Sequence, residues 1–216
     1  MYNLHSHTLL SDGSLLPSEV AVRYLDKGYK VIAITDHADY CNIKSLISAV
    51  TAFCSHWPKN SGITVLPGIE LTHIPPIQFN PLAKYARKNG IKVIVAHGET
   101  TMEPVIPGTN RAAILSDIDI LAHPGLISDE DTLLAKEKDI FLELTSRKGH
   151  SDTNAHVVKQ ALKHGAKLIL DNDSHEPEDI ITPEELAGIG INSGVSKEGI
   201  DTIYRNIEEF IKRRKG

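Results

Sequence analysis

The chain has 216 residues, of which 41% are hydrophobic and 24% are charged, and its formal net charge is −5. This composition is that of a globular protein rather than a disordered or fibrous one, and the length suits one large α/β domain. The mild acidity gives no overall attraction for nucleic acid, and no apolar run approaches the ~20 residues that a membrane helix needs.

Seven short runs of mostly four to eight residues are nearly continuously apolar. This pattern is typical of strands in a sheet that is covered on both faces. The predicted strands span residues 2–5, 31–35, 64–71, 92–96, 118–122, 140–144 and 167–170.

Helical patterns lie between and after these runs. The helix predicted from Pro17 has proline at its first position and ends at Gly28, and Gly165 ends another. Seven strands, each followed by a helix, predict a parallel sheet, which we expect to close into a barrel forming a single domain over residues 1–216. The predicted helices span residues 17–27, 42–57, 78–88, 111–114, 128–138, 153–164 and 197–213.

Two features bear on the cellular location. Residues 1–5 lack the basic and apolar regions of a signal peptide. Cys41 and Cys54 form no CxxC pair, so neither a disulfide framework nor a thiolate zinc site is expected. The sequence therefore predicts a cytoplasmic protein without membrane association.

Polar side chains, many of them among the 11 histidines, follow the predicted strands where each strand ends. The carboxyl ends of parallel strands lie on one edge, and in a barrel that edge is the usual active-site face. Barrel closure brings these ends together, whereas an open sheet would spread them along a line. The segments are His5-Ser6-His7, Asp36-His37, Glu70, His97, His123, Thr145-Ser146-Arg147 and Asp171-Asn172-Asp173-Ser174-His175.

The spacing of these residues favours metal ligation. His5 and His7 are two apart on a strand and so face the same side, and Asp173 and His175 repeat this relation. Imidazoles and carboxylates without a thiolate suit Zn, Mn or Fe. At least nine candidate ligands gather at this edge, enough for two or three divalent metal ions at three or four ligands each.

The other five histidines are interpreted individually. His56 and His164 lie in predicted helices and are expected to face solvent, and His156 is expected to be structural. His73 follows Glu70 by three residues and is placed at the rim, most simply without a function. The role of His150 stays open.

Four motifs, in the right order along the chain, resemble those of the polymerase and histidinol phosphatase (PHP) family. His5-Ser6-His7-Thr8 with Ser11-Asp12-Gly13 resembles the first motif, and Thr35-Asp36-His37 resembles the second. His123-Pro124 and Asp173-Ser174-His175 resemble the third and fourth. The resemblance implies a distorted (β/α)7 TIM-like barrel with a trinuclear metal site.

The resemblance also implies a distribution of ligands, with Glu70 bridging two ions. Many family members have histidine at the position of Asp12, and a carboxylate there favours Mn or Fe because it is a harder ligand. Asp36 and Asp171 are interpreted as residues that orient ligands. The implied ligands are His5, His7, Glu70 and Asp173 for the first ion, Glu70, His97 and His123 for the second, and Asp12, His37 and His175 for the third.

Such a site predicts hydrolysis of a small phosphorylated substrate, with histidinol phosphate as the substrate that the family suggests. A hydroxide bridging two metals would attack phosphorus while the ions neutralise charge. Asp173 and Glu70 are the candidate catalytic carboxylates, and Arg147 and Arg111 are candidate phosphate-binding residues because a guanidinium can hold two phosphate oxygens. Glu99 could anchor a basic residue or a ligand histidine.

Two alternatives stay open. The first is a phosphodiesterase or exonuclease, although no basic stripe with interleaved aromatic residues indicates a nucleic-acid track. The second is a noncatalytic, metal-stabilised binding domain, which would be expected to have lost ligands. Specificity is assigned to the loops at residues 75–81 and 102–110, and the sequence does not predict the oligomeric state.

Overall fold

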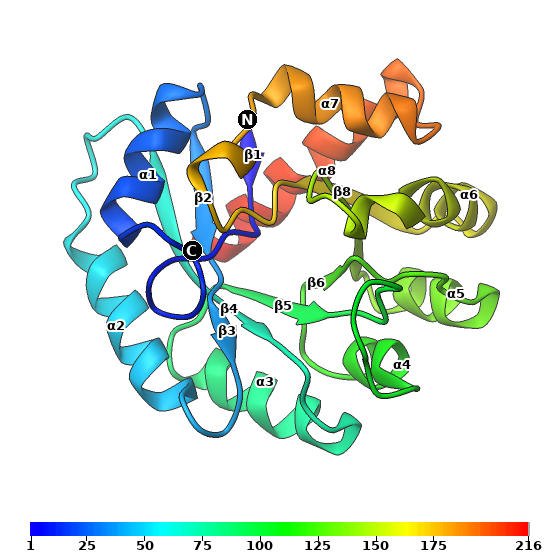
Figure 1. Cartoon of the computed structure of the whole chain (residues 1–216), viewed down its shortest axis with the longest axis horizontal. Helices are drawn as coiled ribbons and strands as arrows, with labels where there is room; N and C mark the ends of the chain where they lie inside the picture. Colours follow the sequence, from blue (N-terminus) through cyan, green and yellow to red (C-terminus); the bar gives the residue numbers. More distant parts are fainter. Residues whose placement is uncertain (216) are drawn as a thin grey trace.

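The seven predicted strands are present in the computed structural model, which describes residues 1–215 (Figure 1). Every pairing among the described strands is parallel, in the order β1-β2-β4-β5-β6-β7-β8. Their side chains are buried on both faces, as continuous apolar runs require. The strands are β1 (Tyr2–Asn3), β2 (Val31–Ile34), β4 (Thr64–Leu71), β5 (Val93–His97), β6 (Ile120–Ala122), β7 (Phe141–Thr145) and β8 (Lys167–Asp171).

The two edge strands, β1 and β8, meet through polar contacts rather than a regular ladder. The Leu4 amide donates to Asp171 Oδ1 at 2.5 Å, and the Asn172 amide donates to Asn3 Oδ1 at 2.7 Å. One isolated bridge joins Ser6 to Ser174. The predicted barrel is therefore confirmed as a nearly closed one, and the described contacts place Asp171 at the closure instead of against a ligand histidine.

One short strand, β3 (His37–Ala38), was not predicted. The apolar run of β2 ends at Ile34, and the chain returns to pair with β4 two residues after Thr35. In this register His37 lies opposite Glu70. The break between β2 and β3 therefore places the second histidine motif beside the carboxylate of β4.

Helices cover the outside of the strands, as Figure 1 shows for α1 to α7. The helix α7 was missed because two glycines weaken its pattern, although Thr182 and Glu185 form a capping box at its start. The helices are α1 (Pro17–Asp26), α2 (Ile43–His56), α3 (Phe79–Lys88), α4 (Thr109–Ile114), α5 (Asp129–Glu137), α6 (Asn154–His164), α7 (Pro183–Asn192) and α8 (Lys197–Lys215).

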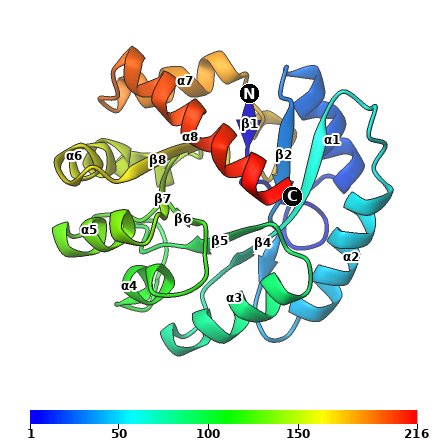
Figure 2. The ribbon, with the colours of Figure 1, turned by 180° about the vertical axis from the view of Figure 1, so that it is seen from behind.

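Helix α8 crosses the barrel on the side seen in Figure 2. Phe210 packs edge-on against Phe141 at the start of β7, with ring centroids 5.6 Å apart, and Arg214 pairs with Asp119 just before β6. These contacts close the amino-terminal end of the barrel and leave the carboxyl ends of the strands free for a site. No helix within residues 1–215 is long and apolar enough to cross a membrane.

Candidate metal centre

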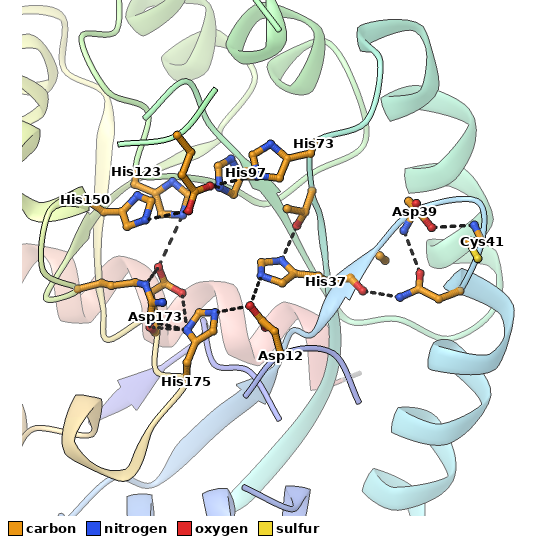
Figure 3. A pocket seen from close by; sticks show the side chains of 15 residues that line it. Asp12, His37, Asp39, Cys41, His73, His97, His123, His150, Asp173 and His175 are labelled. Atoms are coloured by element: carbon orange, nitrogen blue, oxygen red, sulfur yellow. Dashed lines mark hydrogen bonds and ion pairs between the residues drawn. The ribbon is translucent and has the colours of Figure 1, made fainter. Parts of the chain in front are cut away.

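All nine predicted metal ligands meet at the carboxyl ends of the strands. Most of them line a pocket of about 520 Å³, in which imidazoles and carboxylates surround a central opening (Figure 3). His5, His7 and Glu70 lie beneath it and are fully buried. The strand ends therefore converge as the sequence predicts, and the predicted ligands form overlapping groups of three or four residues.

The first group surrounds Asp173. His7 Nε2 lies 3.2 Å from Asp173 Oδ1 and 3.0 Å from His5 Nε2. His5 Nε2 lies 3.5 Å from the same Asp173 oxygen and 3.6 Å from Glu70 Oε2. These four side chains present nitrogen and oxygen atoms to one small, buried volume.

The second group shares Glu70 with the first. His123 Nε2 lies 3.8 Å from Glu70 Oε1, and the rings of His97 and His123 are 4.5 Å apart. One ligand atom from each of these three residues lies within 4.8 Å of the others. Glu70 therefore stands between two groups, where a bridging carboxylate would have to be.

The third group is the most exposed. Asp12 Oδ2 lies 3.3 Å from His37 Nε2 and 3.3 Å from His175 Nε2. The ring of His7 stacks on that of His175 at 4.1 Å, which joins this group to the first. The Asp12 side chain is 52% exposed, so this end of the site opens directly to solvent.

Three buried atoms of the cluster have no hydrogen-bond partner: His7 Nδ1, Glu70 Oε1 and His123 Nδ1. Buried polar atoms in proteins are almost always paired, so unpaired nitrogen and oxygen atoms in one pocket need an explanation. All three belong to residue types that ligate divalent cations. The described residues thus fit the metal ions that the sequence predicts.

The pKa values of the cluster follow from burial and mutual charge. Burial and the nearby His37 lower the pKa of His7 to about 3, so this imidazole is neutral. Burial alone would raise the pKa of Glu70, but His5 and His37 hold it well below its usual range. Burial also opposes charge on His37, yet Glu70 and Asp12 raise its pKa to about 10. Neutral imidazoles and ionised carboxylates are the forms that bind cations, so His7 and Glu70 are ready to bind, whereas His37 must release a proton when an ion binds.

The cluster also contains a residue that the sequence interpretation missed, Glu143 in β7. Its Oε1 lies 2.6 Å from His5 Nδ1, and its Oε2 accepts a hydrogen bond from the His123 amide at 2.9 Å. A carboxylate on one ring nitrogen of a histidine fixes the tautomer and turns the other nitrogen toward the ligand. A charged residue in the middle of an apolar strand was the available signal.

Replacing Glu143 by glutamine is expected to lower metal affinity about 10- to 100-fold, because His5 loses the carboxylate that orients it. The fold should survive, since glutamine can still accept from the His123 amide. Competition with a chromogenic chelator measures the affinity, with Glu185→Gln, a capping residue outside the pocket, as the matched control. Equal affinities in the two variants would contradict this role.

The loop that carries Asp12 is held by Asp36. One Asp36 oxygen accepts from the Thr8 amide and the Ser11 hydroxyl, both at 2.7 Å, and the other accepts from the Thr8 hydroxyl at 2.8 Å. A Cβ on Gly13 would lie 2.6 Å from the His7 backbone carbon, so this turn requires glycine. Asp36 therefore orients the ligand-bearing loop rather than a single histidine.

Backbone strain concentrates at this pocket. Among residues 1–215, four non-glycine residues have positive φ angles, and three of them, His73, His123 and Asp173, line the pocket. Such conformations cost about 1–3 kcal/mol each and persist where the surrounding structure imposes them. The strain indicates that these side chains are held for a role in the site.

The two predicted phosphate-binding arginines lie in different places. Arg147 lines the pocket, with Nη1 2.7 Å from His175 Nδ1 and Nε 3.9 Å from Asp173 Oδ2. Arg111 lies outside the pocket on α4, where it pairs with Glu130 at 2.9 Å and Asp131 at 2.7 Å. The prediction that Arg111 binds substrate is therefore not supported, because its guanidinium faces acidic residues of α5.

Glu99 holds neither a basic residue nor a ligand histidine. Its Oε1 accepts from the Asn110 amide at 3.0 Å, and the Asn110 side chain accepts from the Glu99 amide at 2.8 Å. This reciprocal pair fixes the ends of the loop at residues 99–110. Within that loop, Glu103 extends to the pocket, where Oε2 lies 3.1 Å from His97 Nε2, and no sequence pattern indicated this.

The remaining histidines divide between surface and pocket. His56 is exposed, as expected. His156 hydrogen-bonds to the Ile127 carbonyl. His164 hydrogen-bonds to Asp129 and is half-buried, which is more than expected. His73 lies at the pocket rim as predicted. His150, left open by the sequence, is buried beside His123, with the two rings 4.4 Å apart.

Comparisons with known proteins agree with the geometry. Residues 2–170 match the model of the PHP domain, which ends before the fourth motif. An uncharacterized protein of Methanocaldococcus jannaschii is 43% identical over 215 residues, which are 98% of this chain and 99% of that protein. A Clostridium novyi protein named "Probable phosphatase" is 28% identical over 80% of this chain and 78% of its own. The DNA polymerase/3'-5' exonuclease PolX of Bacillus subtilis is 25% identical over 82% of this chain, but over 34% of the polymerase.

Solved structures show the same fold. A candidate histidinol phosphatase from Listeria monocytogenes superposes with a TM-score of 0.61 at 12% identity, over 83% of this chain and 97% of that chain. An amidohydrolase superposes with a TM-score of 0.60 at 13% identity, over 94% of this chain and 71% of that one. The family model spans well over half of the sequence and includes the first three motifs. The resemblance is thereby confirmed, and the chain belongs to the PHP domain family.

Proposed function

We propose that this PHP-family chain is a metal-dependent phosphoesterase that hydrolyses a small phosphomonoester of the histidinol phosphate kind. One observation carries the proposal: nine imidazoles and carboxylates converge on one pocket, with Arg147 on its wall. Family membership and the relatives named as phosphatases support the class of reaction. The size of the pocket supports a small substrate.

The proposed ligand sets follow the three groups. His5, His7, Glu70 and Asp173 would hold a first ion, Glu70, His97 and His123 a second, and Asp12, His37 and His175 a third. When bound, divalent Zn, Mn or Fe ions supply an activated water and neutralise phosphate charge. Because Asp12 is a carboxylate on the open side, the third position is the one where Mn or Fe would be favoured.

Arg147 is the proposed phosphate-binding residue. His175 Nδ1 faces both Arg147 Nη1 at 2.7 Å and the Asp173 carbonyl at 3.1 Å. With its proton on Nδ1, His175 donates to the carbonyl and no longer accepts from the arginine. The guanidinium, which Asp173 and Asp179 also approach at 3.9 and 3.5 Å, can then turn its donors toward two phosphate oxygens at the pocket wall.

Asp173 and Glu70 are the proposed catalytic carboxylates. Asp173 presents Oδ1 to His7 and Oδ2 toward Arg147, so it lies between the buried histidines and the phosphate-binding side. Burial would raise its pKa, but His5 and His7 hold it well below the usual range. Asp173 is therefore ionised, and its carboxylate can accept a hydrogen bond from water and orient it for attack, or take its proton as a general base.

A substrate screen tests the proposal. The protein, supplied with Mn or Zn, is assayed against phosphomonoesters that include histidinol phosphate, and against dinucleotides and single-stranded DNA. We expect turnover of monoesters. Turnover confined to the diester substrates would support the exonuclease alternative, and no turnover by fully metal-loaded protein would support a binding domain.

Substitution of Arg147 separates phosphate binding from a structural role. We expect Arg147→Ala to raise KM by about 10- to 100-fold, because a charge-assisted, bidentate contact is worth about 1.5–3 kcal/mol. Arg147→Lys should recover only part of this loss, since an ammonium lacks the fork of donors. Steady-state kinetics measures both variants, with Arg111→Ala as the matched control. Equal KM values for Arg147→Ala and Arg111→Ala would contradict the assignment.

A further inference from the structure

Three side chains at the pocket rim form a group beside the one proposed to hold the second ion. Glu103 Oε2 lies 3.0 Å from His73 Nε2 and 3.1 Å from His97 Nε2. The three ligand atoms lie within 4.8 Å of one another. The side chains of His73 and Glu103 are 45% and 42% exposed, so the group is open to ions from solvent. We call His73, His97 and Glu103 the rim group.

The rim group shares His97 with Glu70 and His123, the residues proposed to hold the second ion, which we call the inner group. His97 Nδ1 faces the Gly98 carbonyl at 3.0 Å, so Nε2 is the nitrogen left to bind an ion. Nε2 faces Glu103, and His97 is also close enough to Glu70 and His123 to share an ion with them. Because the Gly98 carbonyl occupies Nδ1, Nε2 is the nitrogen that would serve either group. One nitrogen lone pair serves one ion. His97 therefore cannot complete both groups at once.

We propose that the rim group is a zinc site that competes with the inner second ion for His97, so that excess zinc inhibits the enzyme. The inference rests on the proposed function in one respect, namely that His97 is a ligand of the second ion. Loss of His97 leaves Glu70 and His123 to hold that ion, which is fewer than the three ligands of a typical catalytic site.

The chemistry of the rim group favours zinc. Two histidines and one glutamate are a known zinc ligand set that keeps a fourth position open. Ligands about 2.0–2.2 Å from one tetrahedral ion lie about 3.3–3.6 Å apart. Glu103 Oε2 lies 3.0 and 3.1 Å from the two histidine nitrogens, so a small outward shift of the side chains admits the ion.

The neighbours of the rim group hold its shape. His150 Nε2 lies 3.7 Å from the other carboxylate oxygen, Glu103 Oε1, and leaves Oε2 to the rim. The rings of His73 and His97 lie 4.4 Å apart. His73 has a left-handed backbone, with φ of 52°, which aims its ring at this group at an energetic cost. Figure 3 shows His73 and His97 side by side on the wall opposite Asp12 and His175.

Crystals of the metal-loaded protein, soaked with excess zinc, test the inference directly. We expect an anomalous peak at the zinc edge between His73, His97 and Glu103, together with weakened density at the inner second position. No peak at the rim would overturn the proposal. Full occupancy of both positions would overturn the competition for His97.

Variants give an independent binding test. His73→Asn keeps the left-handed backbone, because asparagine tolerates positive φ, and Glu103→Gln removes the charge while preserving size. Isothermal titration of the metal-loaded wild type with further zinc should show an additional, weaker binding event that each variant weakens about tenfold or more. The control is His164→Asn, which removes a histidine that pairs with Asp129 outside the pocket. Identical titrations for all four proteins would contradict the rim site.

Activity provides the third measurement. We expect zinc to activate the wild type at low concentration and to inhibit it in excess, with the inhibitory zinc concentration raised about tenfold in His73→Asn and Glu103→Gln. Inhibition at the same concentration in both variants and in the control would overturn the competition. The crystal and the titration need no substrate, so failure of the phosphatase proposal remains distinguishable from failure of the rim site.

Discussion

Substitution of His123 by alanine is expected to lower kcat/KM for phosphoester hydrolysis by at least about 10³-fold, because the metals supply several kcal/mol of charge stabilisation. His123 Nε2 lies 3.8 Å from Glu70 Oε1 and 3.7 Å from Asp173 Oδ2. It thus lies between the ligand sets that would hold the first two ions. Steady-state kinetics, with elemental analysis of the same sample, should show that both turnover and bound metal fall.

Misfolding has to be separated from loss of the ligand. His123 has a φ angle of 28°, which asparagine tolerates better than alanine. His123→Asn should therefore keep the barrel, seen as an unchanged circular dichroism spectrum, and still lose activity. His164→Ala serves as the control, since it changes a histidine outside the pocket. A His123→Asn enzyme with the wild-type rate would remove His123 from the site.

Removal of metal by a chelator is expected to lower the melting temperature by about 10–20 °C. An ion present at 100 times its Kd stabilises the folded state by about 2.7 kcal/mol, so two ions contribute about 5 kcal/mol. At this chain length, 1 kcal/mol shifts the melting temperature by about 2–4 °C. The physical reason is local: three buried nitrogen and oxygen atoms of the ligand cluster have no hydrogen-bond partner. Differential scanning calorimetry measures the shift.

Two controls define this result. Addition of Mn or Zn in excess of the chelator should restore the original transition, which excludes irreversible damage. The His123→Asn variant should show a smaller shift, because it has already lost a ligand. Equal melting temperatures with and without chelator, in a protein shown to be metal-free after treatment, would mean that the cluster does not bind ions tightly.

The fold and most of the cluster could be predicted from the sequence because, in a parallel barrel, the order of the strands also determines where the residues at their ends lie. Apolar runs such as those ending at His97 and His123 mark buried strands, and polar residues at their ends must share one face. Polar residues that are far apart in the sequence could therefore be placed in one cluster from the positions of the strand ends alone. The same logic placed Asp173 and His175 beside His5 and His7 at the closing edge.

The sequence predicted less well where position depends on loops or on helix rotation. Glu103 reaches the pocket through a loop whose path depends on the pair formed by Glu99 and Asn110. His150 enters it from a short 3₁₀ turn after β7. Arg111 follows a loop near the site, but the rotation of a short helix points it at Asp131 instead. None of these outcomes follows from a periodic pattern.

Elemental analysis of the purified protein tests the central claim most directly. Protein expressed with Mn, Zn or Fe in the medium, and passed through a desalting column, is analysed by inductively coupled plasma mass spectrometry against its amino-acid concentration. The proposed ligand groups predict two or three divalent ions per chain. Fewer than one ion per chain, in correctly folded protein supplied with each metal in turn, would contradict a multinuclear metal centre.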